Sequence, residues 1–166
     1  MISLRLPELK QAADKLFAKE DFDYFLVREI NITTGTSFHI DGRLHKDFYT
    51  EEEMAEMRNT VYADWKQLRP VCYQLIKGKK LPLSFQITLS LSPDNIDKFS
   101  ARYHLSYDSS QITGLYLHFR YENKILTMST GTSMNVFTMD KSPDRAWDEM
   151  ARLILKHAGI YHEELT

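Results

Sequence analysis

The feature that most limits the fold of this chain is a strict alternation of apolar and polar residues in its second half. It is clearest over residues 115–121 and recurs over residues 85–91. Successive side chains of a β-strand point to opposite faces, so both segments predict strands with one buried face and one polar face. Strands of this kind are typical of an antiparallel sheet whose second face is open to solvent.

The strand over 115–121 is expected to pair with the segment that follows it. Glu122-Asn123 is a turn signal, and a two-residue turn at this point keeps one face of the hairpin apolar throughout. The predicted facing pairs are Phe119 with Leu126, Leu117 with Met128 and Leu115 with Thr130. Gly131-Thr132 then predicts a second turn, which leads into a strand over 134–139.

Four amphipathic helices are predicted between the strands. Their apolar residues recur every three or four positions, which is the spacing of one helix face. Prolines at first helical positions and glycines beyond the last turn mark where several of them begin and end. The expected helices cover residues 7–18, 51–77, 93–103 and 142–158.

The helix over 51–77 is the longest of the four. Thr50 and Glu53 form a capping box at its start. Pro70 removes a backbone donor inside it, so a kink or a break is expected next to this proline. The predicted buried face carries Met57, Val61 and Leu68.

Both halves of the chain follow one order: a strand, a helix, three strands and a helix. The boundary falls near residue 81, which predicts two half-repeats over about 1–80 and 81–166. Residue identity between the halves is slight, so an internal duplication rests on element order alone. We expect an α+β fold, with residues 1–166 forming a single domain of mostly antiparallel sheet and about four helices.

Composition excludes several classes of protein. Lys and Arg number 21 against 23 Asp and Glu, and the net charge of −2 argues against a strongly basic nucleic-acid coat. Cys72 is the only cysteine, which excludes an intrachain disulfide and a cysteine-cluster metal site. The longest apolar run is far too short to span a membrane, and the first residues lack the pattern of a secretory signal. We therefore expect a cytoplasmic protein with no membrane partner.

A polar strip in the first half is the most suggestive candidate site. If the chain reverses at Asp41 and Gly42 through an odd-length loop, then His39, Arg43 and His45 share one sheet face. Two imidazoles and the Asp41 carboxylate could bind a divalent transition metal. The alternatives are a solvated sheet face without function, which the open face of an antiparallel sheet also produces, and a ligand-binding surface.

A second strip comprises Tyr116, His118 and Arg120, which alternate with the apolar residues of their strand. An aromatic ring, an imidazole and a guanidinium on an open sheet can stack on bases or bind phosphates. An outer sheet face without function is again the alternative. Neither a nucleophile elbow nor a phosphate-binding loop is present in the sequence, which argues against an enzyme.

Four segments carry a family resemblance: residues 38–49 (FHIDGRLHKDFY), residues 130–133 (TGTS), residues 137–142 (FTMDKS) and Trp147-Asp148. With them the chain resembles an uncharacterised family of small bacterial proteins, a domain of unknown function of about this length. This resemblance implies no activity and no site residue. The doubled element order is also similar to one domain of the sliding DNA clamps and to the saddle of TATA-box-binding proteins, a likeness of topology that carries no function.

The absence of a catalytic constellation favours a non-catalytic binding or scaffold protein without a cofactor. A metal-dependent hydrolase that uses His39, Asp41 and His45 is the alternative from another class. A weak, clamp-like nucleic-acid-binding protein is a third reading, and its basic residues would lie on or beside the helices over 7–18 and 93–103. Because acidic residues lie on the same helices, a protein or small-molecule partner is favoured over nucleic acid.

Overall fold

The computed structural model of the protein describes residues 1–58 and 60–165. Its strands form one seven-stranded sheet in the order β3-β2-β4-β5-β6-β1-β7, and every neighbouring pair is antiparallel. The strands are β1 (Ser3–Arg5), β2 (Leu26–Thr33), β3 (Ser37–Asp41), β4 (Ser84–Ser90), β5 (Ile112–Glu122), β6 (Ile125–Met134) and β7 (Glu163–Glu164). The expected α+β fold with an antiparallel sheet is confirmed.

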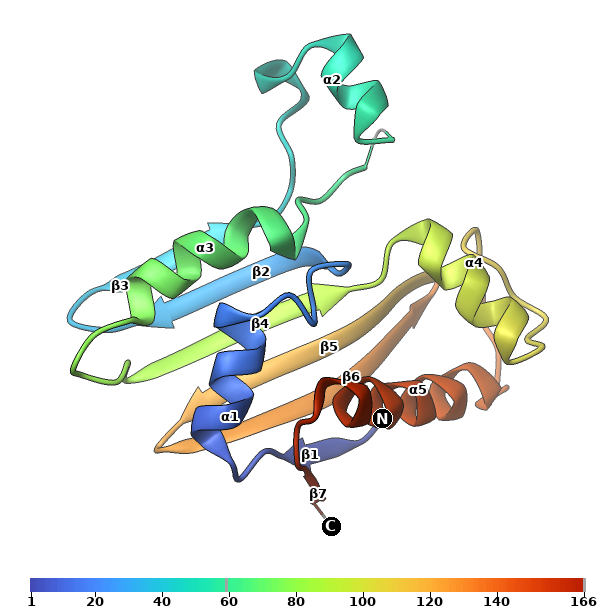
Figure 1. Ribbon diagram of the computed structural model, residues 1–166. Helices are drawn as coiled ribbons and strands as arrows, with labels where there is room; N and C mark the ends of the chain where they lie inside the picture. Colours follow the sequence, from blue (N-terminus) through green and yellow to red (C-terminus); the bar gives the residue numbers. More distant parts are fainter. Residues whose placement is uncertain (59, 166) are drawn as a thin grey trace.

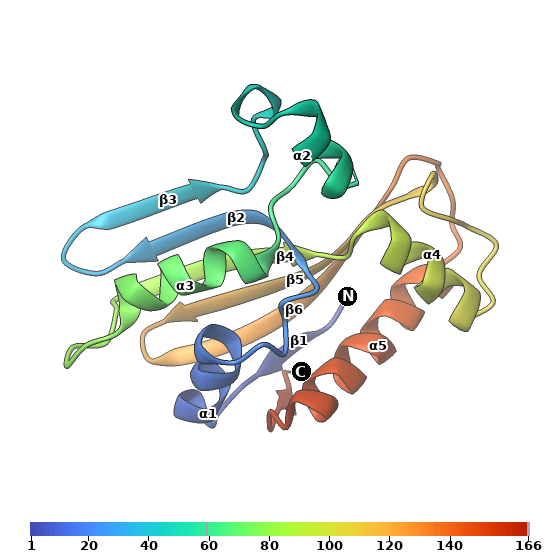
Figure 2. The same ribbon diagram turned by 45° about the horizontal axis from the view of Figure 1, so that its top comes forward.

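Helices cover one face of this sheet (Figures 1 and 2). The helices α1, α3 and α5 lie across the sheet. Helix α4 packs at one end of the sheet beside α5, where the rings of Phe99 and Trp147 meet edge to face with their centroids 5.7 Å apart. The α-helices are α1 (Leu9–Ala13), α2 (Glu51–Glu56), α3 (Trp65–Ile76), α4 (Pro93–Arg102) and α5 (Ser142–Ala158). A π-helical turn, η1 (Asp14–Ala18), continues α1, and a 3₁₀ turn, η2 (Lys46–Phe48), precedes α2.

The hydrophobic core lies between the sheet and these helices. The inward side chains of β2, β4, β5 and β6 meet those of α1, η1, α3 and α5 in one continuous cluster. Trp65 and Trp147 are fully buried in it. Each indole N–H donates to a backbone carbonyl, of Leu16 and Tyr116 respectively, so neither polar atom is left unpaired.

The hairpin of β5 and β6 has the predicted buried face, but the predicted register is wrong by two residues. Phe119 faces Met128 and Leu117 faces Thr130. The turn is formed by Asn123 and Lys124, which have φ angles of 54° and 63°. A tight hairpin turn with two positive φ angles matches the twist of the strands, and a shift of two residues leaves every side chain on its face.

Two strand predictions are also wrong. β6 continues through Gly131 and Thr132 to Met134, so these residues form no turn, and no strand follows over 135–139. In the first half, β3 ends at Asp41 and the chain does not reverse there. Residues 42–58 and 60–64 instead form a projection that leaves the sheet after β3 and returns before α3; we call it the arm (Figure 1).

The long helix predicted over 51–77 is two helices. Its start is correct, because Thr50 accepts from the Glu53 N–H and the Glu53 carboxylate accepts from the Thr50 N–H. However, α2 ends at Glu56, and α3 starts at Trp65 and runs through Pro70 without a break. Of the predicted buried residues, Met57 and Leu68 are half-buried and Val61 is exposed.

Each half begins with a strand, a helix and two strands, rather than the three strands predicted; the first half then ends in α2 and α3, and the second in α5 and the short β7. Strand pairing repeats between the halves only in part. The pair of β2 with β3 matches the pair of β5 with β6, but β4 pairs with β5, whereas β1 pairs with β6 and β7. The two half-repeats stay a prediction from element order, and strands of both halves belong to one sheet.

Candidate functional site

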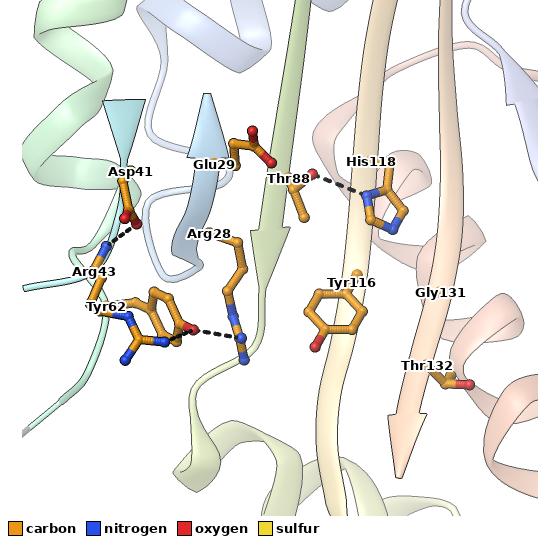
Figure 3. Close-up of a pocket in the computed structure, with 10 residues that line it drawn as sticks. All are labelled: Arg28, Glu29, Asp41, Arg43, Tyr62, Thr88, Tyr116, His118, Gly131 and Thr132. Atoms are coloured by element: carbon orange, nitrogen blue, oxygen red, sulfur yellow. Dashed lines mark hydrogen bonds between the residues drawn. The ribbon is translucent and has the colours of Figure 1, made fainter. Parts of the chain in front are cut away.

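The sheet face opposite the helices carries polar side chains (Figure 3). The register aligns a polar row across it, in which Asp41 faces Glu29, Glu29 faces Thr88 and Thr88 faces His118. A hollow of about 590 Å³ lies on this face. We call it the open-face hollow. It is lined by Arg28, Glu29, Asp41, Arg43, Tyr62, Thr88, Tyr116, His118, Gly131 and Thr132.

Arg28 enters the hollow because β2 is irregular at this point. The register between β2 and β4 shifts between Val27 and Glu29, as in a β-bulge, and so Arg28 lies on the open face beside Glu29. Its guanidinium is half-buried and well held. Nε donates to Ser90 Oγ at 3.2 Å, Nη1 to the Tyr62 hydroxyl at 2.9 Å and Nη2 to the Thr113 carbonyl at 3.4 Å.

Two tyrosine rings flank this guanidinium. Arg28 Cζ lies 4.0 Å from the centroid of the Tyr62 ring and 5.3 Å from that of Tyr116. Both distances lie within the range of cation–π attraction. The Tyr62 hydroxyl also accepts from Nη2 of Arg43 at 3.4 Å, so two guanidinium groups converge on one oxygen.

The positive charge of these arginines is not neutralised by a direct partner. Within the described residues, neither Arg28 nor Arg43 forms an ion pair with a carboxylate. Glu29 points towards the opposite end of the hollow, and Asp41 accepts from the backbone N–H of Arg43 at 2.9 Å (Figure 3). The hollow therefore has a cationic end, at Arg28, Arg43 and Tyr62, and an end with acidic and neutral groups.

The base of the arm positions Tyr62 and Arg43. These residues face each other in an isolated antiparallel bridge. Gly42 joins the bridge to the sheet, since its N–H donates to the Arg28 carbonyl and its carbonyl accepts from the Ala63 N–H. A Cβ at Gly42 would collide with the Val27 carbonyl oxygen, so this close approach requires glycine.

Two more glycines accommodate Tyr116. A Cβ at Gly114 would collide with the Tyr116 ring, which lies over this position. Gly131 faces Tyr116 across the β5–β6 pair, and a Cβ there would lie 3.1 Å from Nε2 of His118. The tyrosine ring therefore lies along the sheet, where it forms part of the floor of the open-face hollow.

His118 stacks on Tyr116, with ring centroids 5.8 Å apart and an interplanar angle of 27°. Its Nδ1 shares a hydrogen bond of 3.1 Å with Thr88 Oγ1. Burial lowers the pKa of His118 below its ordinary value of 6.5, because desolvation disfavours the imidazolium. At neutral pH this ring is therefore uncharged.

A model of a family of unknown function, DUF5721, matches residues 15–163. The chain belongs to this family. No curated protein matches it, and no solved structure matches it. The expected resemblance to an uncharacterised family is confirmed, whereas the comparisons give no support to the likeness to a sliding-clamp domain.

In this DUF5721 protein, four of the seven predicted site residues come together. Asp41, Arg43, Tyr116 and His118 all line the open-face hollow, although they were predicted as two separate strips. Arg28, Tyr62 and Thr88 also line the site and were not predicted. The sequence signal for Arg28 is the spacing of three between Val27 and Ile30, which breaks the alternation of β2.

The other three predicted residues lie outside the hollow. His39 is 60% exposed, and its Nδ1 lies 2.8 Å from Asn31 Oδ1. His45 is exposed in the arm, and Arg120 pairs with Glu122 at 2.6 Å. The prediction that His39, Arg43 and His45 share a sheet face is wrong, because β3 ends at Asp41 and Arg43 already belongs to the arm.

The metal site of the alternative hydrolase reading is not formed by the described residues. None of their His, Cys, Asp and Glu side chains lie in a group of three that could hold a metal ion. His39, Asp41 and His45 therefore do not provide the ligands that the hydrolase reading requires. Among the described residues no helix is long and apolar enough to cross a membrane.

Proposed function

We propose that this protein is a non-catalytic binding protein that holds a small organic phosphate monoester at the cationic end of the open-face hollow. The observation that carries the proposal is Arg28, a half-buried guanidinium without a carboxylate partner among the described residues. Burying a charge is costly unless it is paired, so a bound anion would supply the missing partner.

Unused hydrogen-bond donors support an oxyanion in this position. A guanidinium has five N–H groups, and Arg28 uses three of them. The Tyr62 hydroxyl accepts from both arginines, and no described residue accepts its proton. Donors from Arg28, Arg43 and Tyr62 thus converge, which suits a group with several acceptor oxygens such as a phosphate monoester.

The charges of the whole hollow favour a small ligand over nucleic acid. Glu29 and Asp41 line the same hollow as the two arginines, so the formal charges balance. A polyanion that followed the sheet would meet both carboxylates, whereas a single phosphate group needs only the cationic end. This agrees with the preference for a protein or small-molecule partner over nucleic acid.

The side chains that could perform nucleophilic chemistry are poorly placed for it. His118 bonds Thr88 through Nδ1, but no described carboxylate bonds its other ring nitrogen, as an orienting group would. Burial raises the pKa of the Cys72 thiol to about 12, which keeps it protonated in the core. Both observations favour binding over catalysis.

Chemical-shift titration of the ¹⁵N-labelled protein with methyl phosphate tests the proposal. We expect shifts at Arg28, Arg43 and Tyr62 with an affinity in the millimolar range, since the probe offers little beyond its phosphate group. Arg28→Gln should abolish these shifts. Arg120→Gln is the matched control, because Arg120 lies on the same sheet face outside this hollow, and it should leave them unchanged.

The proposal fails if saturating methyl phosphate causes no localised shifts in the wild-type protein. It also fails if Arg28→Gln and Arg120→Gln weaken binding equally, because binding would then reflect general surface charge. Methanol at the same concentration, which lacks the anion, should shift none of these resonances.

A further inference from the structure

A second hollow of about 540 Å³ lies between the arm and α4. We call it the arm hollow. Its floor and walls include the apolar residues Leu26, Met57, Val61, Leu91, Pro93, Ile96 and Ile112. Ligand sites are typically concave and mostly apolar with a few placed polar groups, and their volumes commonly run from about 300 to 1,000 Å³.

The two hollows meet at the cationic end of the open-face hollow. Arg28 and Tyr62 line both of them. Tyr62 comes from the arm and Arg28 from β2, and the hydrogen bond between them lies where the two hollows adjoin. If these residues hold a phosphate group, its ester substituent can therefore reach the apolar lining of the arm hollow.

We propose that the bound phosphate monoester carries an apolar chain and that this chain lies in the arm hollow. The inference rests on the proposed function and deepens it, since it assigns the ligand to the anionic amphiphiles. A chain in the arm hollow would cover Val61, which is 49% exposed, and Met57, which is half-buried. Removing apolar surface from water is the general driving force for such binding.

Charges at the rim of the arm hollow also favour an apolar substituent over a second anionic group. Arg58 pairs with Asp94 at 2.6 Å, so the arm and the start of α4 are linked by an ion pair whose charges compensate each other. Glu56 and Asp64 also line the hollow, and neither forms an ion pair among the described residues. Their negative charge would repel a second phosphate.

Titration calorimetry with methyl, butyl and hexyl phosphate, each below its micelle concentration, tests the inference. In the wild-type protein, hexyl phosphate should bind at least about tenfold more tightly than methyl phosphate, because each buried methylene adds to the affinity. Val61→Trp should fill the arm hollow and remove this gain without weakening methyl phosphate. Val71→Trp is the matched control, since Val71 is also 49% exposed but lies on α3 outside the hollow.

The outcomes separate this inference from the proposed function. If methyl and hexyl phosphate bind equally well to the wild-type protein, the inference of an apolar chain is wrong and the proposed phosphate site stands. If none of the three binds, the proposed function itself is wrong. Val61→Asp provides a second variant should Val61→Trp fail to fold. A chain-length gain that persists in a folded Val61 variant overturns the inference.

Discussion

At the scale of single residues, glycines shape the open-face hollow as much as its polar side chains do. Gly42 lets the base of the arm approach the Val27 carbonyl, and this approach places Tyr62 and Arg43 beside Arg28. Gly114 and Gly131 leave room for the rings of Tyr116 and His118. These three positions tolerate no Cβ without movement of a neighbour.

Gly42→Ala should therefore destabilise the protein, by roughly 1–3 kcal/mol, because the added methyl group overpacks against backbone that cannot move aside easily. Urea denaturation measures the free energy of unfolding. Gly35→Ala is the control, since a Cβ at Gly35 meets nothing within 4 Å. Equal stability of the two variants would contradict the packing argument at Gly42.

His118 makes stability depend on pH. Its pKa is lowered in the folded protein by burial, so between this pKa and the ordinary value of 6.5 the unfolded chain binds more protons than the folded one. The stabilisation that comes from burying the neutral His118 ring is complete above pH 6.5 and is lost as the pH falls below this value. Stability should thus drop from about pH 7.5 to about pH 5.5, and less so in His118→Gln.

The matched control for this pH effect is His39→Gln, since His39 is exposed and lies outside the hollow. This variant should keep the wild-type loss on acidification, and at neutral pH it should change stability by no more than about 0.5 kcal/mol. If His118→Gln loses as much stability as the wild-type protein, burial of the imidazole has no thermodynamic effect.

At the scale of elements, β4 and β5 were predicted well because the alternation of their side chains is a direct consequence of the pleat. The long helix was predicted wrongly because Met57 and Val61 keep helical spacing across a loop. The backbone of Val61 instead makes a tertiary contact, because its carbonyl accepts from the Leu44 N–H. Arg58, with a φ of 55°, also ends the helical path. Periodicity alone does not reveal such long-range hydrogen bonds.

The candidate site was predicted in part for the same reason. Tyr116 and His118 follow from the alternation of β5, and they lie on the predicted face. Arg28 depends on a bulge, and Tyr62 depends on the return of the arm to the sheet, so neither position follows from a regular pattern. The sequence therefore predicts the residues that regular strands place in the hollow. It does not predict the residues whose place depends on irregular backbone.

The capping box of α2 provides a test at this scale. Thr50→Ala should lower the local stability of the arm by about 1 kcal/mol, because the Glu53 N–H loses its acceptor. Met54, the buried residue of α2, is outside the main core cluster, so the loss should be local. We expect faster amide hydrogen exchange in α2 with little change in the midpoint of global unfolding.

Ser92→Ala is the control, since Ser92 caps α4, whose Ile96 and Phe99 belong to the core. This variant should lower the global unfolding midpoint. A comparable global loss in Thr50→Ala would show that the arm unfolds together with the sheet rather than before it.

At the scale of the whole molecule, strands from the two halves of the sequence are neighbours in one sheet. β4 lies between β2 and β5, and β1 lies beside β6. Fragments 1–80 and 81–166 should therefore remain unfolded by circular dichroism when prepared singly, because each lacks strands that cover its edges and part of its core. A fragment that folds alone would favour two independent half-repeats.

The position of β1 has a consequence for the order of events during synthesis. Ser3 pairs with Ser129, so the whole segment between these residues must be synthesised before β1 finds its neighbour β6. Contacts between residues so distant in sequence are slow to form, since the entropy of closing the intervening loop is lost first. Until then the nascent chain carries Leu4 and Leu6, fully buried in the finished protein, exposed to whatever binds apolar segments at the ribosome exit. Completion of β6, rather than of any earlier element, is the step that ends this exposure.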